Sequence, residues 1–533
     1  MTGMTDIALA ALDRTINMMV ADPDCRLRPY QASAIMQVRD ALARGVRRIM
    51  LAAPTGAGKT LLASTILSGF VAEERPGLFV VPRIELINQT YSKFIAEDII
   101  DIGVMQASHP LTNHLRSIQI ASVQTLQRRL LPNADIVFLD EVHQWHDFYR
   151  RWMLDLEWAN VPFIGLSATP WRKGLGSYFE ELITVAGIQE LIDEGYLSKF
   201  KVFAPSHPDL SGVHTIAGDY HEGELAEAMD KKPLVADIVT TWLKHSNGRP
   251  TLVFAVNRAH AKHIQEKFAE AGVATGYVDC ETPASEREEI RNKFASGEYR
   301  VVCNVDVLTL GVDWNVRTIV LARPTKSEMR YVQAVGRGLR PAKDKDHCLI
   351  LDHSDTTLRL GFVSDIVHDE LDDGKIGIQK RNRDNIKLPK ECPQCAYLRP
   401  AGTNKCPNCG FEARPVSKVR VVDGELRELD RNGRQIIDRA EIFGMFKWIV
   451  QERGNNPGRA WHLSTEYFGQ KPPSSVFNNA EPTRPSIEIL RWEKSRRIAW
   501  AKAHARPSIT ASSSAVPVGG FYVNPSSPED IPF

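Results

Sequence analysis

The sequence predicts an α/β protein with two consecutive parallel sheets, and three observations carry this prediction. Between about residues 27 and 355, short apolar runs alternate with amphipathic helical stretches, which is typical of parallel strands with helices on both faces. The alternation is interrupted over residues 201–240, so it forms two blocks rather than one. At 533 residues the chain is also too long for one hydrophobic core.

We therefore divide the chain into seven segments. They are an N-terminal amphipathic helix over residues 1–26, a first α/β lobe over 27–200, a connection over 201–240, a second α/β lobe over 241–375, a four-cysteine module over 388–415, a helical module over 416–505 and a disordered tail over 506–533.

Bulk composition excludes little. Lys and Arg number 66 against 65 Asp and Glu, a formal net charge of +1, so a nucleic-acid partner has to be argued from local clusters. Four of the eight cysteines are scattered, which fits a reducing compartment. The N-terminus does not resemble a signal peptide, and no uncharged apolar run reaches membrane-spanning length. We expect a cytoplasmic protein with no membrane partner.

The first lobe is organised around APTGAGKT, residues 53–60, which stands between a strand pattern and a helical pattern. A strand, a glycine-bearing turn and a helix N-terminus together make an anion site. We expect Lys59 to face the β- and γ-phosphates of ATP and the Thr60 hydroxyl to bind Mg²⁺. The strict motif begins with Gly, and Ala53 stands there instead. The predicted contact residues are Pro54, Thr55, Gly56, Ala57, Gly58, Lys59 and Thr60.

Two further motifs follow strands of the same lobe. DEVH, residues 140–143, and SATP, residues 167–170, each end a predicted strand, and such strand ends form the ligand-binding edge of a parallel sheet. Asp140 can hold Mg²⁺ through water, and Glu141 can orient and deprotonate the attacking water. An acidic pair at a strand end can also be a helix N-cap. Its combination with the phosphate loop favours the catalytic interpretation.

The second lobe has no phosphate loop, so we expect it to complete the first site. A helix is predicted over residues 327–341. Its polar face carries Gln333, Gly336, Arg337 and Arg340. Such a row can be a solvated stripe. Glycine is a poor choice there, so we favour guanidinium groups aimed across a cleft at the γ-phosphate.

The ordered motifs resemble those of superfamily 2 helicases and translocases of the DExH type. The resemblance covers about residues 27 to 355 and rests on LRPYQ, APTGAGKT, VVPRIELINQ, ASVQTLQRR, DEVH, LSATP, TLVFAVNRAHA, NVDVLTLGVDWN and QAVGRGLR. It implies two RecA-like lobes, with ATP between them and a nucleic-acid strand crossing both.

The resemblance also implies residue roles. These are adenine recognition by Arg28 and Gln31, catalysis by Lys59, Asp140, Glu141, Arg337 and Arg340, coupling of hydrolysis to movement by His143, Ser167 and Thr169, and completion of the ATP site by Gly311, Asp313, Gln333, Arg337 and Arg340. Within the superfamily, the chain resembles bacterial RadD-type DNA-repair ATPases. That likeness rests on GLSATPWRKGLG (165–176), the later cysteines and WHLSTEYFGQKPP (461–473).

After the second lobe, CPQC and CPNC stand ten residues apart. Two such turns can close a tetrahedral site of four thiolates with no opening for water, which argues for structural Zn²⁺. The ligands would be Cys392, Cys395, Cys406 and Cys409. A redox pair is the alternative. Basic residues crowd around the cluster, and we favour a phosphate-contacting surface over a solvated linker.

Residues 435–505 read as helices that share a core. The tail ends in SPEDIPF, which resembles the C-terminal tip of bacterial single-stranded-DNA-binding proteins. The resemblance implies binding to proteins that recognise such tips, or to the protein's own basic surface, through Asp530, Ile531, Pro532 and Phe533. A chance match is the alternative.

Together these observations predict an ATP-dependent DNA helicase or translocase of DNA repair, recombination or fork processing, using ATP, Mg²⁺ and structural Zn²⁺. We expect it on single-stranded or branched DNA, in the nucleoid. The alternatives are an RNA-remodelling DExH helicase, the motor of a restriction system, and a DNA-binding adaptor whose ATPase is a switch.

Overall fold

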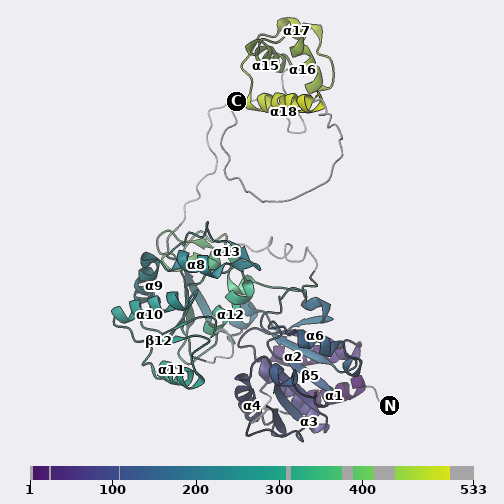
Figure 1. Cartoon of the computed structure of the whole chain (residues 1–533), viewed down its shortest axis with the longest axis vertical. Coiled ribbons are helices and arrows are strands. Elements are labelled where there is room, and N and C mark those ends of the chain that lie inside the picture. The colour runs from purple at the N-terminus through teal and green to yellow at the C-terminus, as the bar shows by residue number, and fades with distance from the viewer. Residues whose placement is uncertain are drawn as a thin grey trace, which may run out of the picture. The chain divides into compact units, whose positions relative to one another are not determined.

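The computed structural model describes residues 4–22, 26–106, 109–307, 314–374, 388–412 and 439–504. The chain divides into two units, Met1–Pro415 and Val416–Phe533. The first unit holds two parallel sheets and the cysteine cluster, and the second holds helices α15 to α18 (Figure 1). The predicted α/β class with two sheet lobes is confirmed. None of the described helices is long and apolar enough to cross a bilayer.

The first sheet has seven parallel strands in the order β3-β4-β2-β5-β6-β1-β7. They are β1 (Arg48–Ala52), β2 (Gly77–Val81), β3 (Ile102–Met105), β4 (Ile118–Ser122), β5 (Ile136–Leu139), β6 (Phe163–Ser167) and β7 (Glu181–Thr184). Successive side chains of a strand point to opposite faces, and here Phe79 lies in one apolar core while Leu78 and Val80 lie in another. Burial on both faces explains the continuous apolar runs of the central strands.

Helices cover both faces of this sheet. They are α1 (Met4–Ala21), α2 (Pro29–Ala43), α3 (Lys59–Ala72), α4 (Leu86–Ala96), α5 (Val123–Leu126), α6 (Asp147–Met153) and α7 (Ile188–Asp193), with short 3₁₀ turns η1 (Leu156–Trp158) and η2 (Leu175–Ser177). Leu12, Ile35 and Ile66 of α1 to α3 pack in the first core. Tyr149 and Trp152 of α6 pack in the second.

The second sheet has six parallel strands in the order β12-β13-β11-β14-β15-β8. They are β8 (Lys199–Phe203), β11 (Thr251–Phe254), β12 (Thr275–Val278), β13 (Val301–Asn304), β14 (Thr318–Leu321) and β15 (His347–Asp352). The structure places β8 in this sheet, because it pairs with β15 from Lys199 to Phe203. The first strand of the second lobe therefore lies across the predicted boundary between the first lobe (27–200) and the connection (201–240).

The remaining elements of the first unit surround the second sheet. They are a hairpin of β9 (Thr215–Ile216) and β10 (Asp219–Tyr220), helices α8 (Glu222–Met229), α9 (Lys232–His245), α10 (Arg258–Glu270), α11 (Ala284–Ser296), α12 (Glu328–Gly338) and α13 (Thr356–Leu360), the turn η3 (Val363–Asp365), and the hairpin of β16 (Lys390–Glu391) and β17 (Leu398–Arg399). Val235, Ile264 and Phe268 of α9 and α10 pack with Val253 and Val320 of the sheet.

The cysteine-bearing hairpin continues the second sheet beyond its edge strand β8. The Ala204 amide donates to the Ala396 carbonyl oxygen at 2.9 Å, and Phe203 forms an isolated antiparallel bridge with Tyr397. Their rings meet edge to face at 5.4 Å. The module thus covers an edge that would otherwise expose unpaired backbone groups.

Helix α1 is held against α3 by a close contact at Gly69. The Thr15 hydroxyl donates to Ala11 O at 3.0 Å and lies 3.3 Å from Ile66 O. A Cβ on Gly69 would overlap Ala11 O and the Thr15 hydroxyl. The absence of a side chain at Gly69 therefore sets how closely the two helices approach.

We predict that Gly69→Ala lowers the free energy of unfolding by about 1 to 3 kcal/mol, because an added methyl group forces the helices apart. Alanine has a better helix propensity than glycine, by up to about 1 kcal/mol. A loss of stability would therefore be caused by the changed packing of α1 on α3. Denaturant unfolding measures it, with Ser68→Ala on the same helix as the control. Equal or higher stability of Gly69→Ala would show that α1 is not packed this way.

Candidate nucleotide and metal sites

The predicted phosphate loop connects β1 to α3. Gly56 and Gly58 have φ of 93° and 86°, a left-handed conformation that glycine adopts readily. A Cβ on Gly58 would overlap the Gln31 side-chain nitrogen. Ala53, at the place of the motif's first glycine, is fully buried, and its amide donates to Ser167 O at 2.9 Å. The alanine therefore packs beneath the loop and leaves its glycine turns intact.

Arg28 and Gln31 brace this loop from behind. Gln31 donates through Nε2 to Ala57 O at 2.8 Å and accepts through Oε1 from the Arg28 amide at 2.9 Å. The Arg28 guanidinium lies 4.3 Å from the centre of the Tyr196 ring. Neither residue lines the nucleotide cavity described next. Their role in adenine recognition stays a prediction.

A cavity of about 440 Å³ lies over the loop, between the two lobes. The lobe-1 residues that we predicted and that line it are Pro54, Thr55, Gly56, Gly58, Lys59, Thr60, Asp140 and Glu141. Arg337 and Arg340 line it from the second lobe. Residues from both halves of the first unit, far apart in the sequence, thus share one cavity.

The charged side chains at the base of this cavity contact one another. Lys59 Nζ lies 3.4 Å from Glu141 Oε1, and the Glu141 amide donates to Asp140 Oδ1 at 3.0 Å. Burial, and then the neighbouring Glu141, raise the pKa of Asp140. Burial alone would also raise the pKa of Glu141, but Lys59, His143 and Arg337 outweigh it and lower that pKa. Glu141 is therefore ionised at neutral pH.

Glu141 also has an unusual backbone, with φ of 47°. Non-glycine residues rarely adopt this left-handed conformation, and when they do they are concentrated at functional sites. It turns the carboxylate toward Lys59 on one side and His143 on the other. The strain is consistent with the predicted catalytic role.

A hydrogen-bond network connects this acid to the second lobe. Gln333 Nε2 lies 3.0 Å from both His143 Nε2 and Thr169 Oγ1. A side-chain amide nitrogen only donates, so His143 Nε2 accepts and its Nδ1 carries the proton. Nδ1 lies 3.3 Å from Glu141 Oε2 and 3.1 Å from Ser167 Oγ. The three predicted coupling residues and Gln333 thus form one buried network.

Helix α12 positions the second-lobe side chains. A Cβ on Gly336 would lie 3.1 Å from Thr55 Cβ and Oγ1, and one on Gly338 would overlap Cys348 Sγ. Glycine at these places lets the helix lie on the phosphate loop and on its own sheet. Arg337 is 5 % exposed, so the row of polar residues is no solvated stripe.

The cavity also contains residues that we did not predict. Gln89 and Lys93 of α4 line it, as do Leu61, Leu86, Thr90, Ala96, Glu97 and Pro341. The positive charge of Lys93 lowers the pKa of Asp140, opposing burial. Gln89 and Lys93 are four residues apart on a helix that follows a strand end, and this was the signal that could have found them. The predicted site residues Gly311 and Asp313 and the tail residues 530–533 lie outside the described residues.

A second cavity, of about 600 Å³, lies between the lobes at the other end of α12. Trp171 and Arg172, directly after SATP, line it from the first lobe, and Lys326 and Arg330 from the second. Trp171 stacks on His368 at 4.4 Å. Arg172 donates to the carbonyl oxygen of His143 at 3.4 Å. Arg172 therefore connects this cavity directly to the DEVH segment.

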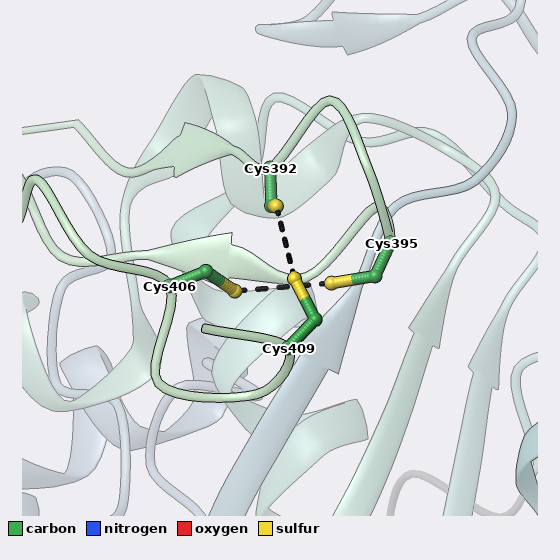
Figure 2. A group of neighbouring side chains, drawn as sticks. All are labelled: Cys392, Cys395, Cys406 and Cys409. Atoms are coloured by element: carbon green, nitrogen blue, oxygen red, sulfur yellow. Dashed lines mark hydrogen bonds between the residues drawn. The ribbon is translucent and has the colours of Figure 1, made fainter. Parts of the chain in front are cut away.

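The four clustered cysteines form a candidate metal site. Figure 2 shows their side chains turned toward one another, and the four sulfur atoms lie within 4.8 Å of each other. Cys392 and Cys409 are 3.7 Å apart, and Cys395 and Cys406 3.8 Å. A tetrahedral zinc ion with Zn–S bonds near 2.3 Å needs sulfur atoms roughly 3.8 Å apart. The arrangement therefore fits Zn²⁺ with four thiolate ligands.

The basic surface expected around this cluster is only partly supported. Arg399 is 5 % exposed and donates to the carbonyl oxygens of Thr403 and Asn404. Lys405 lies 3.4 Å from Glu412. Arg399 therefore braces the hairpin and cannot contact a phosphate. The other basic residues of the expected surface lie outside the described residues, apart from Lys390.

Comparisons with known proteins match both lobes. Residues 24–172 match the family "Type III restriction enzyme, res subunit", and residues 231–342 match "Helicase conserved C-terminal domain". The chain is 32% identical over 352 residues to "Putative ATP-dependent helicase IRC3" of Saccharomyces cerevisiae, covering 61% of this chain and 51% of the yeast protein. The chain therefore spans about half the length of that relative.

Two further proteins are similar to this chain over both lobes. The chain is 25% identical over 370 residues to "DNA 3'-5' translocase XPB2" of Sulfurisphaera tokodaii, covering 61% of this chain and 80% of that protein. A solved fragment of a putative HsdR subunit of a type I restriction enzyme from Vibrio vulnificus has a TM-score of 0.51 at 20% identity, covers 69% of this chain and 70% of its own, and shows the fold. Together the comparisons support a superfamily 2 helicase.

We predict one zinc ion per chain, measurable by elemental analysis of the purified protein. Cys406→Ser should remove it and unfold the hairpin, because zinc binding supplies on the order of 10 kcal/mol to such small sites. Limited proteolysis between residues 388 and 412 should then become rapid. Cys280→Ser, at an exposed cysteine outside the cluster, is the control. Protein without zinc, or equal damage from both substitutions, would contradict the site.

Proposed function

We propose that the chain is an ATP-driven DNA helicase or translocase of DNA repair, recombination or fork processing. The observation that carries the proposal is the cavity shared by Lys59 and Glu141 of one lobe with Arg337 and Arg340 of the other. Thr60 and Asp140 would hold Mg²⁺, which neutralises phosphate charge. A site split between two lobes can close on its substrate and reopen after hydrolysis, and that motion is what a motor needs.

Glu141 would accept a proton from the attacking water. In this structure Lys59 lies beside Glu141 and lowers its pKa. The β- and γ-phosphates of bound ATP would attract the Lys59 ammonium, and the pKa of Glu141 would then rise. Glu141 would become a stronger base once the substrate is present. Arg337 and Arg340 would stabilise the charge that develops on the γ-phosphate.

The hydrogen bonds of Gln333 would couple binding and hydrolysis of the nucleotide to movement of the second lobe. Gln333 touches both His143, which neighbours the base, and Thr169, which precedes Trp171 by two residues. Trp171 and Arg172 line the second interlobe cavity. A strand in that cavity would offer phosphates to Arg172 and bases to Trp171, and so act on the same network.

DNA is the favoured polynucleotide. Support comes from the archaeal relative named as a DNA translocase, which the chain covers over 80% of its length. We propose the RadD-type subfamily on residues 165–176 and on the cysteine cluster that follows the second lobe. Cytoplasmic location and binding of partner proteins through residues 530–533 remain part of this proposal.

A second candidate is the motor of a restriction system, which the match of residues 24–172 to a restriction subunit favours. The two are separated by incubating the full chain with ATP and plasmid, forked DNA or RNA. ATP hydrolysis stimulated by DNA without cleavage supports the repair motor. Cleavage supports the restriction motor, and stimulation by RNA alone would overturn both in favour of RNA remodelling.

We predict that Lys59→Ala and Glu141→Gln each lower the rate of ATP hydrolysis by about 10²- to 10⁴-fold, through loss of phosphate binding and of the base respectively. Glu141→Gln should still bind ATP, measured with a fluorescent analogue. Glu97 lines the same cavity, and Glu97→Gln is the control. Hydrolysis at the normal rate in Glu141→Gln would refute the assignment of the base.

We predict that Gln333→Ala weakens stimulation of hydrolysis by DNA more than hydrolysis without DNA. The substitution leaves His143 Nε2 and Thr169 Oγ1 without their donor across the lobes. If Gln333 acts through His143, the double variant with His143→Ala should be little worse than His143→Ala alone. Additive losses would mean that the two residues act independently.

A further inference from the structure

The second unit is a helical module with its own core. It consists of α15 (Arg439–Glu452), α16 (Gly458–Phe468), α17 (Ser474–Asn479) and α18 (Ile487–His504). Phe443, Phe446 and Ile449 of α15 pack with Leu463 of α16 and Ile489 of α18. Neither the nucleotide site nor the metal site includes any of its residues.

One face of α18 anchors it in this module. Ile489 and Glu493 are 3 % exposed, and Glu493 lies 2.5 Å from Arg453 of α15. Trp492 packs at 5.0 Å on Tyr467, and Arg496 lies 3.3 Å from Glu466 of α16. Residues 489, 492, 493 and 496 follow the i, i+3, i+4, i+7 spacing of one helix face. The orientation of α18 is therefore defined by these contacts.

Outside these anchoring contacts, the surface of α18 is exposed and carries a row of basic residues. Arg491, Lys494 and Arg497 are exposed and follow one another at every third residue. No ion pair among the described residues involves any of the three. Ile487 and Ile498 flank the row with 69 % and 47 % of their surface exposed. A row of cations with apolar ends thus faces away from the module's core.

The module as a whole is also positively charged. Between residues 439 and 504 the sequence has eleven Lys and Arg against six Glu and no Asp, whereas the whole chain carries only +1. The module therefore has a formal net charge of +5, and the remainder of the chain sums to −4. The surface complements a polyanion.

We propose that the outward face of α18 binds the sugar-phosphate backbone of nucleic acid, as a second contact apart from the motor lobes. The inference rests on the proposed function. Three cations at a rise of about 1.5 Å per residue span roughly 9 Å, which suits successive phosphates of one strand. Ile487 and Ile498 lie where the sugars and base faces of that strand would pass. Such a contact keeps the protein bound to the nucleic acid while the lobes open.

The test compares two triple variants of the full chain. Arg491→Ala, Lys494→Ala and Arg497→Ala remove the row, and Arg459→Ala, Lys471→Ala and Arg484→Ala remove the same charge from exposed positions elsewhere on the module. Binding to a labelled single-stranded oligonucleotide is followed by anisotropy over a salt series. ATP hydrolysis without DNA and the thermal unfolding midpoint should be unchanged in both variants.

We expect the first variant to lose about tenfold or more in affinity at low salt, and its salt slope to fall by about 2, since each phosphate contact to a single strand contributes roughly 0.7. The control variant should keep the slope of the unmodified chain. Equal losses in both, or none in the first, would overturn the proposal. A parallel titration uses poly-glutamate as the probe. If the first variant loses binding of poly-glutamate but binds DNA normally, the face binds acidic proteins and the proposal is overturned.

The same experiment separates this inference from the proposed function. If the unmodified chain hydrolyses ATP but does not bind DNA, both fail. If the unmodified chain binds DNA and DNA stimulates its hydrolysis, but the first variant behaves identically, only the role of α18 fails.

Discussion

The contact of Gly336 with Thr55 is the constraint on which the nucleotide site depends. Glycine at this position lets the backbone of α12 lie on the phosphate loop, because a Cβ there would come within 3.1 Å of the threonine. Gln333 lies one turn before this contact and reaches His143. Arg337 and Arg340 lie after it and reach the cavity of Lys59. Helix α12 and the residues directly after it, placed by this close approach, thus supply Gln333, Arg337 and Arg340.

Basic side chains outnumber acidic ones in that cavity, which favours the binding of an anion. Lys59, Lys93, Arg337 and Arg340 line it against Asp140, Glu141 and Glu97, and burying unmatched charge is costly. The Lys59–Glu141 pair offsets part of this cost in the present state. A triphosphate would compete for the same lysine. The ion pair is thus a contact that substrate binding can replace, and through His143 and Gln333 that replacement reaches the second lobe.

The cysteine module has a structural role that its motif does not reveal. By bonding to the residue after β8, it extends the second sheet and covers its edge. His207, just beyond this edge, lies 2.7 Å from Asp355 of the lobe and 2.9 Å from Glu391 of the module. Metal binding and the integrity of the second lobe are therefore linked by geometry. A metal ion held by the four cysteines would also stabilise this edge of the second sheet.

The sequence by itself determined the phosphate loop, DEVH, the four-cysteine cluster and the central strands, because each depends on local chain geometry or on burial of both faces of a strand. Within the two parallel sheets, the strands that we did not predict are β3, β7, β8 and β12, which are the four edge strands. Three of them have partly exposed side chains and so lack a continuous apolar run. Only the tertiary structure decided that Lys93 faces Asp140 and that Gln333 meets His143, since a helix pattern defines a face but not what lies opposite it.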